Sequence, residues 1–182
     1  IVKDSAIYMV DFNLESLKKA AFESRPKNRL LPNISFALNF YFGRLSPEGY
    51  HWVNIGIHAL TAIFLFFFSR DTLVLCTGFS NNGHSSFGSG LYESPNHTVL
   101  IAFIAALIWL AHPVNSSAVT YIVQRMTSLA VMFYMLSLML YIQGRKAQRA
   151  GGALTGRACS FFIGAGLSGV CPLCSKQNTA TL

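Results

Sequence analysis

Residues 52–69 read Trp-Val-Asn-Ile-Gly-Ile-His-Ala-Leu-Thr-Ala-Ile-Phe-Leu-Phe-Phe-Phe-Ser and contain no Asp, Glu, Lys or Arg. A helix of this stretch would be about 27 Å long, close to the ~30 Å hydrocarbon core of a bilayer. Tyr50 and Trp52 supply aromatic residues at its start, and Arg70 follows its end. This pattern is typical of a membrane-spanning helix with interfacial anchors.

Three later stretches repeat the pattern. The second, 95–112, follows Ser94-Pro95, a dipeptide that favours a helix start, and ends at His112-Pro113. The third, 126–143, is followed by a basic segment, and the fourth, 158–175, is rich in glycine, which suits close helix packing in a membrane. The sequence therefore predicts four transmembrane helices, over 52–69, 95–112, 126–143 and 158–175.

The composition agrees with a membrane protein. Of the 182 residues, 52% are hydrophobic and only 12% are charged, against about 25% charged residues in a soluble domain. The net charge of +7 comes from basic residues in the loops between apolar stretches, where anionic lipid headgroups are the simplest partners. No zinc-finger spacing or basic helix interleaved with aromatic residues is present, so the pattern argues against a nucleic-acid partner.

The chain divides into two parts. Residues 1–51 are expected to form part of the first extracytoplasmic loop, with amphipathic interfacial helices over 13–24 and 33–43. Residues 52–182 form the transmembrane bundle. The segment 144–157 carries four basic residues and no acid, which places it on the cytoplasmic side. The predicted fold class is an all-α, multi-pass transmembrane helix bundle.

Polar residues on the first span form a stripe. His51, Asn54, His58 and Thr61 lie within an arc of about 80° on a helix. Such residues are costly in a bilayer and face the bundle interior or water. The stripe is either an interhelical hydrogen-bonding seam or a wall that faces a substrate.

A second polar face precedes the third span and contains Tyr121, Gln124, Arg125 and Ser128. Arg125 either extends its stem toward lipid headgroups or clamps a phosphate with two parallel hydrogen bonds. Arg29 and Lys176 are expected on the same membrane face. Three cations around a polar stripe suit an anionic lipid carrier, and ordinary interfacial anchoring is the simpler alternative.

Five motifs occur in a fixed order along the chain. They are Asn-Arg-Leu-Leu-Pro-Asn-Ile-Ser-Phe-Ala-Leu-Asn at 28–39, Gly-Tyr-His-Trp-Val-Asn at 49–54 with His58 after it, Ala-His-Pro-Val-Asn at 111–115, Ala-Val-Thr-Tyr-Ile-Val-Gln-Arg-Met at 118–126, and Ser-Lys-Gln-Asn-Thr-Ala-Thr-Leu at 175–182. The set resembles polytopic glycosyltransferases of the GT-C superfamily that carry C-terminal tetratricopeptide repeats, relatives of the dolichyl-phosphate-mannose protein mannosyltransferases. One departure is Gln177, where that family often has Glu.

The resemblance implies transfer of a hexose from a polyprenyl-phosphate carrier to a protein or glycan acceptor, without a further cofactor or metal. The membrane would be a bacterial inner membrane or the endoplasmic reticulum. The chain begins at Ile1 without Met, so we expect an internal fragment, inactive alone, with the catalytic acidic pair upstream of Ile1. The resemblance assigns two groups of residues. The expected donor-phosphate ligands are Arg29, His112, Arg125 and Lys176, and the expected pocket wall is His51, Asn54, His58, Tyr121 and Gln124.

Two other functions are compatible with the residues. In the first, the chain is a non-catalytic anchor or scaffold that presents tetratricopeptide repeats, and its polar stripes are packing seams. In the second, Cys171 and Cys174 form the CxxC pair of a membrane thiol oxidoreductase.

Overall fold

The computed structural model describes residues 13–24, 29–80, 95–151 and 156–172, and these ranges are helical with short turns and no β-strand. The helices are α1 Leu14–Phe22, α2 Leu30–Gly43, α3 Pro47–Ser80, α4 Pro95–Ala111, α5 Ser116–Thr120, α6 Arg125–Gly151 and α7 Gly156–Val170, with 3-10 turns η2 Pro113–Asn115 and η3 Ile122–Gln124. The predicted all-α class is therefore confirmed.

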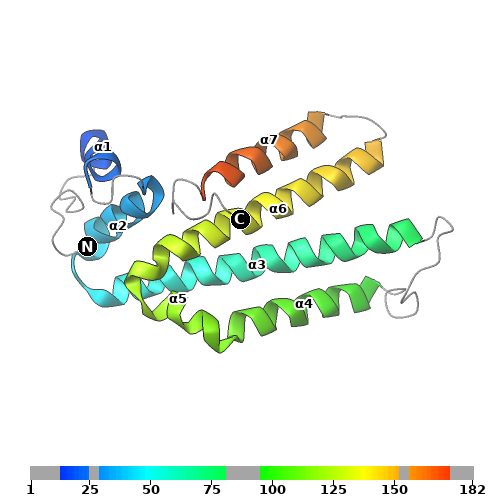
Figure 1. Ribbon diagram of the computed structural model, residues 1–182, viewed down its shortest axis with the longest axis horizontal. Coiled ribbons are helices and arrows are strands. Elements are labelled where there is room, and N and C mark those ends of the chain that lie inside the picture. Colours follow the sequence, from blue (N-terminus) through cyan, green and yellow to red (C-terminus); the bar gives the residue numbers. More distant parts are fainter. Residues whose placement is uncertain (1–12, 25–28, 81–94, 152–155, 173–182) are drawn as a thin grey trace.

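Four long helices lie side by side in the order α4, α3, α6, α7 (Figure 1). Within the described ranges, two segments are long and apolar enough to cross a membrane, Pro47–Cys76 and Ile122–Arg149. A third candidate is the pair Asn96–Ala111 and Pro113–Thr120, which bends by 51° at His112. The chain is thus part of a multi-pass integral membrane protein.

The helices differ in length from the predicted spans. Helix α3 extends beyond 52–69 at both ends, and α6 continues past residue 143 through the basic segment to Gly151. Helix α7 has 15 residues, fewer than the roughly 20 that a straight spanning helix needs. The fourth predicted span, 158–175, stays a prediction, as do the division at residue 51 and the sidedness of the loops.

The lipid-facing and inward-facing sides of α4 are clearly different. Leu100, Ile104 and Ile108 are exposed on the side away from α3, as expected for side chains that contact lipid. Ala102 and Ala106 are buried one turn apart on the side that packs on α3. Small residues at this spacing let the two helix backbones approach closely.

Helices α1 and α2 lie together at the end of the bundle where α3 and α6 begin (Figure 1). Ala20 of α1 and Ala37 of α2 are fully buried against each other. At the end of α2, Arg44 has φ 50°, a left-handed conformation that turns the chain into α3. The Tyr50 hydroxyl donates to the Arg44 carbonyl oxygen at 3.1 Å and fixes this turn.

At its C-terminal end, α3 is linked to α6 by a salt bridge and by a hydrogen bond. Lys146 Nζ lies 2.7 Å from Asp71 Oδ1, and Asp71 is only 2% exposed. Arg149 donates to the Leu75 carbonyl oxygen at 3.3 Å. Basic residues of the segment that we predict to be cytoplasmic therefore fix the register of α6 along α3.

Helix α7 packs closely on α6 through glycine. A Cβ at Gly169 would lie 3.2 Å from Ser137 Oγ, whereas a Cβ at Gly166 would meet no atom within 4 Å. The Ser137 hydroxyl donates to the Ala165 carbonyl oxygen at 2.7 Å, which holds the two helices together. We therefore expect Gly169→Val to destabilise the full-length protein by about 1–3 kcal/mol through overpacking. Thermal unfolding in detergent measures this, with Gly166→Val as the control, and equal midpoints for the two variants would contradict the packing.

Candidate functional site

Arg125 is the centre of a buried polar cluster where α2, α3 and α6 meet. It is the first residue of α6 and its side chain is 0% exposed. Its Nε donates to Asn54 Oδ1 at 2.8 Å, and its Nη2 donates to the Tyr50 carbonyl oxygen at 2.8 Å and to Asn39 Oδ1 at 3.2 Å. One guanidinium therefore joins three helices through a fork of fixed geometry.

Aromatic rings and a serine complete the cluster. The Arg125 Cζ lies 4.6 Å from the Phe36 ring centre and 5.4 Å from the Tyr50 ring centre, distances at which ring quadrupoles attract a cation. The Arg125 Nη1 lies 3.4 Å from Ser35 Oγ. Every partner that we find among the described residues is neutral, so no carboxylate balances this buried positive charge there. An uncompensated charge in a region of low dielectric creates a strong local potential.

Arg29 places a second cation at the same corner. It is the residue before the first turn of α2, and its Nη1 contacts the sulfur of Met126, the residue after Arg125. A thioether is a weak hydrogen-bond acceptor. Two arginine side chains therefore lie near the start of α6, one fully buried and one only partly buried.

The polar stripe of α3 contacts the last turn of α4 and the irregular segment between α4 and α6. His51 Nδ1 is 3.2 Å from the Val119 carbonyl oxygen, and His58 Nε2 is 3.2 Å from the Leu110 carbonyl oxygen. Asn54 Nδ2 lies 3.5 Å from the Val119 and Tyr121 carbonyl oxygens. These carbonyls lie where regular helix is interrupted, and inside a membrane they need internal partners. The stripe therefore acts as a hydrogen-bonding seam in this part of its surface.

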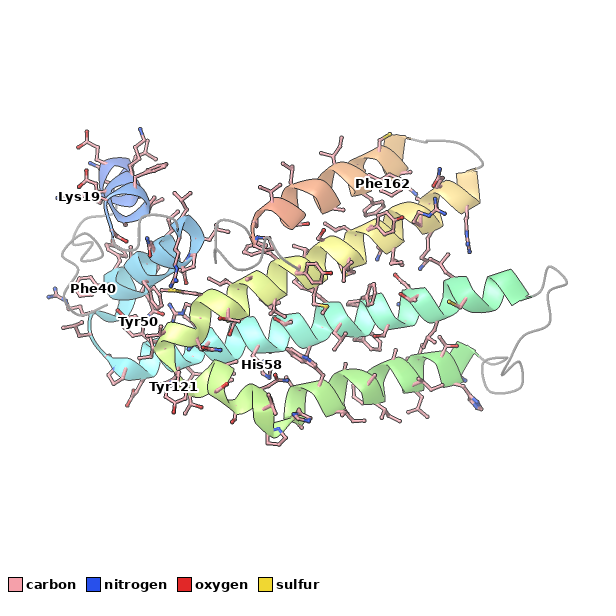
Figure 2. All side chains as sticks on the ribbon, in the orientation of Figure 1. Lys19, Phe40, Tyr50, His58, Tyr121 and Phe162 are labelled. Carbon is pink, nitrogen blue, oxygen red and sulfur yellow. The ribbon has the colours of Figure 1, made fainter. Side chains whose placement is uncertain are left out.

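Two residues of the stripe, His58 and Thr61, also line a cavity of about 220 Å³ between α3, α4, the α5 segment and α6, whereas His51 and Asn54 do not. Figure 2 shows His58 between α3 and α4, on the side of α3 that faces the bend. The polar lining comprises His58, Thr61, Asn115, Ser117, Gln124 and Ser128, together with Thr127. Of the residues predicted as a pocket wall, His58 and Gln124 line this cavity, and the role of the wall in binding a substrate stays a prediction.

An apolar groove of about 630 Å³ runs between α2, α3 and α6. Its walls are largely aliphatic and aromatic: Leu31, Ile34, Leu38, Phe42, Val53, Leu129 and Phe133 line it. Ser35 and Asn39 also line the groove, and both contact the Arg125 guanidinium. The groove thus begins beside the buried cation, which is the arrangement that an apolar chain with an anionic end requires.

The remaining predicted site residues lie apart from this cluster. His112 is exposed, and its Nδ1 accepts from the Val114 backbone N–H at 3.2 Å, which caps the bend. The Tyr121 side chain is 68% exposed, although its carbonyl oxygen meets Asn54. Lys176 lies outside the described residues. Among the described contacts, none joins His112 to Arg29 or Arg125.

The cysteine pair cannot be followed in full, since Cys174 lies outside the described residues. Cys171 is partly buried, and its Sγ lies 3.4 Å from the Leu167 carbonyl oxygen one turn earlier. The thiol oxidoreductase therefore stays an untested alternative.

Sequence reasoning missed several members of the site. Asn39 and Phe36 belong to α2, which the sequence presents as an interfacial helix, and the motif at 28–39 that contains both does not show that they pack on Arg125. Trp109 and Asn115 line the cavity, and Asn115 Nδ2 donates to the Trp109 carbonyl oxygen at 2.7 Å. Asn115 lies in the His-Pro-Val-Asn motif, and this motif could have indicated that Asn115 belongs to the site.

Comparison with known proteins identifies homologues. Protein O-mannosyl-transferase TMTC2 of Homo sapiens is 29% identical over 159 residues, which is 87% of this chain and 16% of that protein. TMTC4 of Homo sapiens is 30% identical over 163 residues, 87% of this chain and 20% of that protein. Tmtc3 of Drosophila melanogaster is 27% identical over 135 residues, 74% of this chain and 14% of that protein.

These relatives confirm the resemblance to mannosyltransferases that the ordered motifs predicted. The chain spans 16% of TMTC2 and 20% of TMTC4, so it corresponds to one segment of each. No family model and no solved structure matches the chain.

Proposed function

We propose that this chain, a homologue of one segment of the TMTC protein O-mannosyl-transferases, is the part of a membrane mannosyltransferase that binds a polyprenyl-phosphate sugar donor. The observation that carries this proposal is the buried Arg125 guanidinium, held by neutral acceptors beside an apolar groove. A polyprenyl phosphate is chemically complementary to this arrangement, because it joins a long apolar chain to an anion.

The two arginines are expected to act differently on the phosphate. The Arg125 Nε and Nη2 donate to Asn54, Asn39 and Tyr50. Arg125 is therefore expected to attract the phosphate by its charge and to hold the helices in place. Arg29 is only partly buried and contacts the sulfur of Met126. We therefore assign direct phosphate contact to Arg29, with charge-assisted hydrogen bonds. For His112 and Lys176 the phosphate role stays a proposal.

Transfer of the sugar forms a bond between an acceptor hydroxyl and the anomeric carbon and breaks the bond from that carbon to a phosphate oxygen. The hydroxyl proton goes to a general base, and the phosphate leaves with the bonding electron pair. Cations beside the leaving phosphate stabilise the charge that develops on it. The matched relatives come from animals, so of the two predicted membranes we propose the endoplasmic reticulum.

An assay of mannosyl transfer by the full-length protein tests the proposal. Arg29→Gln should lower kcat/KM for the lipid donor at least about tenfold, the value expected when one charge-assisted hydrogen bond is lost. Arg44→Gln is the matched control, because Arg44 lies at the other end of α2. Equal activity of the two variants would contradict the phosphate contact. If the wild-type protein transfers no sugar and binds no polyprenyl phosphate, the proposal is wrong and the alternative function, a non-catalytic scaffold, is favoured.

A further inference from the structure

One face of α6 changes from apolar and aromatic to basic toward the C-terminal end of the helix. Tyr134, Leu138, Tyr141, Arg145 and Arg149 lie within an arc of about 80° on the helix. The two tyrosines are 45% and 48% exposed, and both arginines are exposed. Arg149 is the last residue of the candidate span Ile122–Arg149. The two arginines therefore lie where the hydrocarbon core of a bilayer meets the headgroups.

We propose that this face of α6 binds an anionic phospholipid, with the headgroup on Arg145 and Arg149 and an acyl chain along the two tyrosines and Leu138. The occupant is a lipid of the leaflet at this end of the bundle, which we predict to be cytoplasmic. The inference does not rest on the proposed function, whose arginines, Arg29 and Arg125, lie where α6 begins, at the opposite end of the bundle (Figure 1).

Acidic side chains do not balance the positive charge of this face. Residues 94–182 contain no Asp or Glu. Asp71, near the C-terminal end of α3, already pairs with Lys146, the residue after Arg145. Within the described part of the chain, the charges of Arg145 and Arg149 are therefore uncompensated. An anionic headgroup supplies a counter-charge, and cytoplasmic leaflets are rich in such lipids.

Both guanidiniums are held at the surface by neutral acceptors. Arg145 Nη1 donates to Gln148 Oε1 at 2.9 Å, and Arg149 Nη1 donates to the Leu75 carbonyl oxygen at 3.3 Å. Because a guanidinium has five N–H donors in a fixed fork, each arginine keeps further donors for phosphate oxygens. Holding the two side chains in advance also reduces the entropy that is lost when a headgroup binds.

Helix α7 brings a third cation to the same level of the bundle. A Cβ at Gly144 of α6 would lie 2.9 Å from the Phe162 ring of α7, and the two helices run in opposite directions (Figure 1). Arg157 precedes Phe162 by as many residues as Arg149 follows Gly144, so the two arginines lie at about the same level. Arg157 is exposed, and it extends the positive surface beyond α6.

Lipid binding by the full-length protein in detergent tests the proposal, with phosphatidylserine as the anionic probe and phosphatidylcholine as the zwitterionic one. The site variant is Arg145→Gln/Arg149→Gln, and Arg145→Lys/Arg149→Lys keeps the charge. The matched control is Lys18→Gln/Lys19→Gln, which removes two exposed positive charges from α1, at the other end of the bundle. Native mass spectrometry measures the affinity of each protein for both lipids.

We expect the wild type to bind phosphatidylserine at least about tenfold more tightly than phosphatidylcholine at low salt. The glutamine variant should lose this preference, whereas the lysine variant and the control should keep it. Added NaCl should weaken the preference, because salt screens exposed charges. Equal affinity of the wild type for both lipids, an undiminished preference in the glutamine variant, or an equal loss in the lysine variant or the control would overturn the proposal. None of these outcomes depends on whether the protein transfers mannose.

Discussion

Replacing Arg125 by Met is expected to destabilise the full-length protein by at least about 3 kcal/mol. Methionine fills much of the space of the stem but removes the donors to Asn54 Oδ1, Asn39 Oδ1 and the Tyr50 carbonyl oxygen. The side-chain oxygens of Asn54 and Asn39 would then lose this charged donor, and so would the Tyr50 carbonyl oxygen. We expect a large loss of folded protein in detergent, measured by thermal unfolding and size-exclusion chromatography.

Arg125→Lys sharpens this prediction, because it keeps the charge and removes the fork. A single ammonium cannot reach all the acceptors that the Nε–H and Nη2–H groups of the guanidinium bond, so most of the stability should still be lost. Arg145→Met, at an exposed position on the same helix, is the matched control and should unfold like the wild type. Wild-type stability of Arg125→Lys would show that geometry is unimportant and that only charge matters.

The second large effect is expected from Asn54→Asp. This substitution neutralises the Arg125 charge while the packing of the cluster is kept. A carboxylate oxygen would replace the amide oxygen that accepts from Arg125 Nε at 2.8 Å. The amide nitrogen that is lost makes only 3.5 Å contacts, and the Val119 and Tyr121 carbonyl oxygens keep their contacts with His51 Nδ1 and the Gln124 backbone N–H. The cluster should therefore stay assembled as a buried ion pair. The positive charge that attracts the carrier phosphate would be neutralised.

For Asn54→Asp we therefore predict a folded protein whose mannosyl transfer at limiting donor falls at least about tenfold. Initial rates over a range of donor concentrations measure it, and the loss should appear mainly in the KM for the lipid donor. Gln148→Glu adds the same charge at the other end of α6 and should not change the kinetics. Full activity of Asn54→Asp at a low donor concentration would mean that the buried Arg125 charge does not contribute to binding the carrier phosphate.

Much of the fold could be predicted because hydrophobic length decides it. The uncharged stretches at 52–69, 95–112 and 126–143 lie within or almost within α3, α4 and α6, and the amphipathic periods gave α1 and most of α2. The helix ends were less predictable. Helix α2 begins at Leu30 because Pro32 is tolerated in a first turn, and α6 runs on because Lys146 and Arg149 reach back to α3.

The site was only partly predictable, since a polar stripe shows which residues share a face but not what they meet. The stripe on α3 and the importance of Arg125 were visible in the sequence, whereas Asn39 and Asp71 were not. Asp71 pairs with Lys146, 75 residues later, and Asn39 lies 86 residues before its partner Arg125. Such pairs depend on how helices pack, which no local pattern specifies.

The most direct test of the account compares the binding of polyprenyl phosphate and of uncharged polyprenol to the full-length protein in lipid nanodiscs. We predict that the wild type prefers the phosphate at least about tenfold and that Asn54→Asp abolishes this preference while its affinity for polyprenol is kept. Equal affinity of the wild type for both lipids, or an undiminished preference in Asn54→Asp, would contradict the claim that the buried Arg125 charge attracts the carrier phosphate.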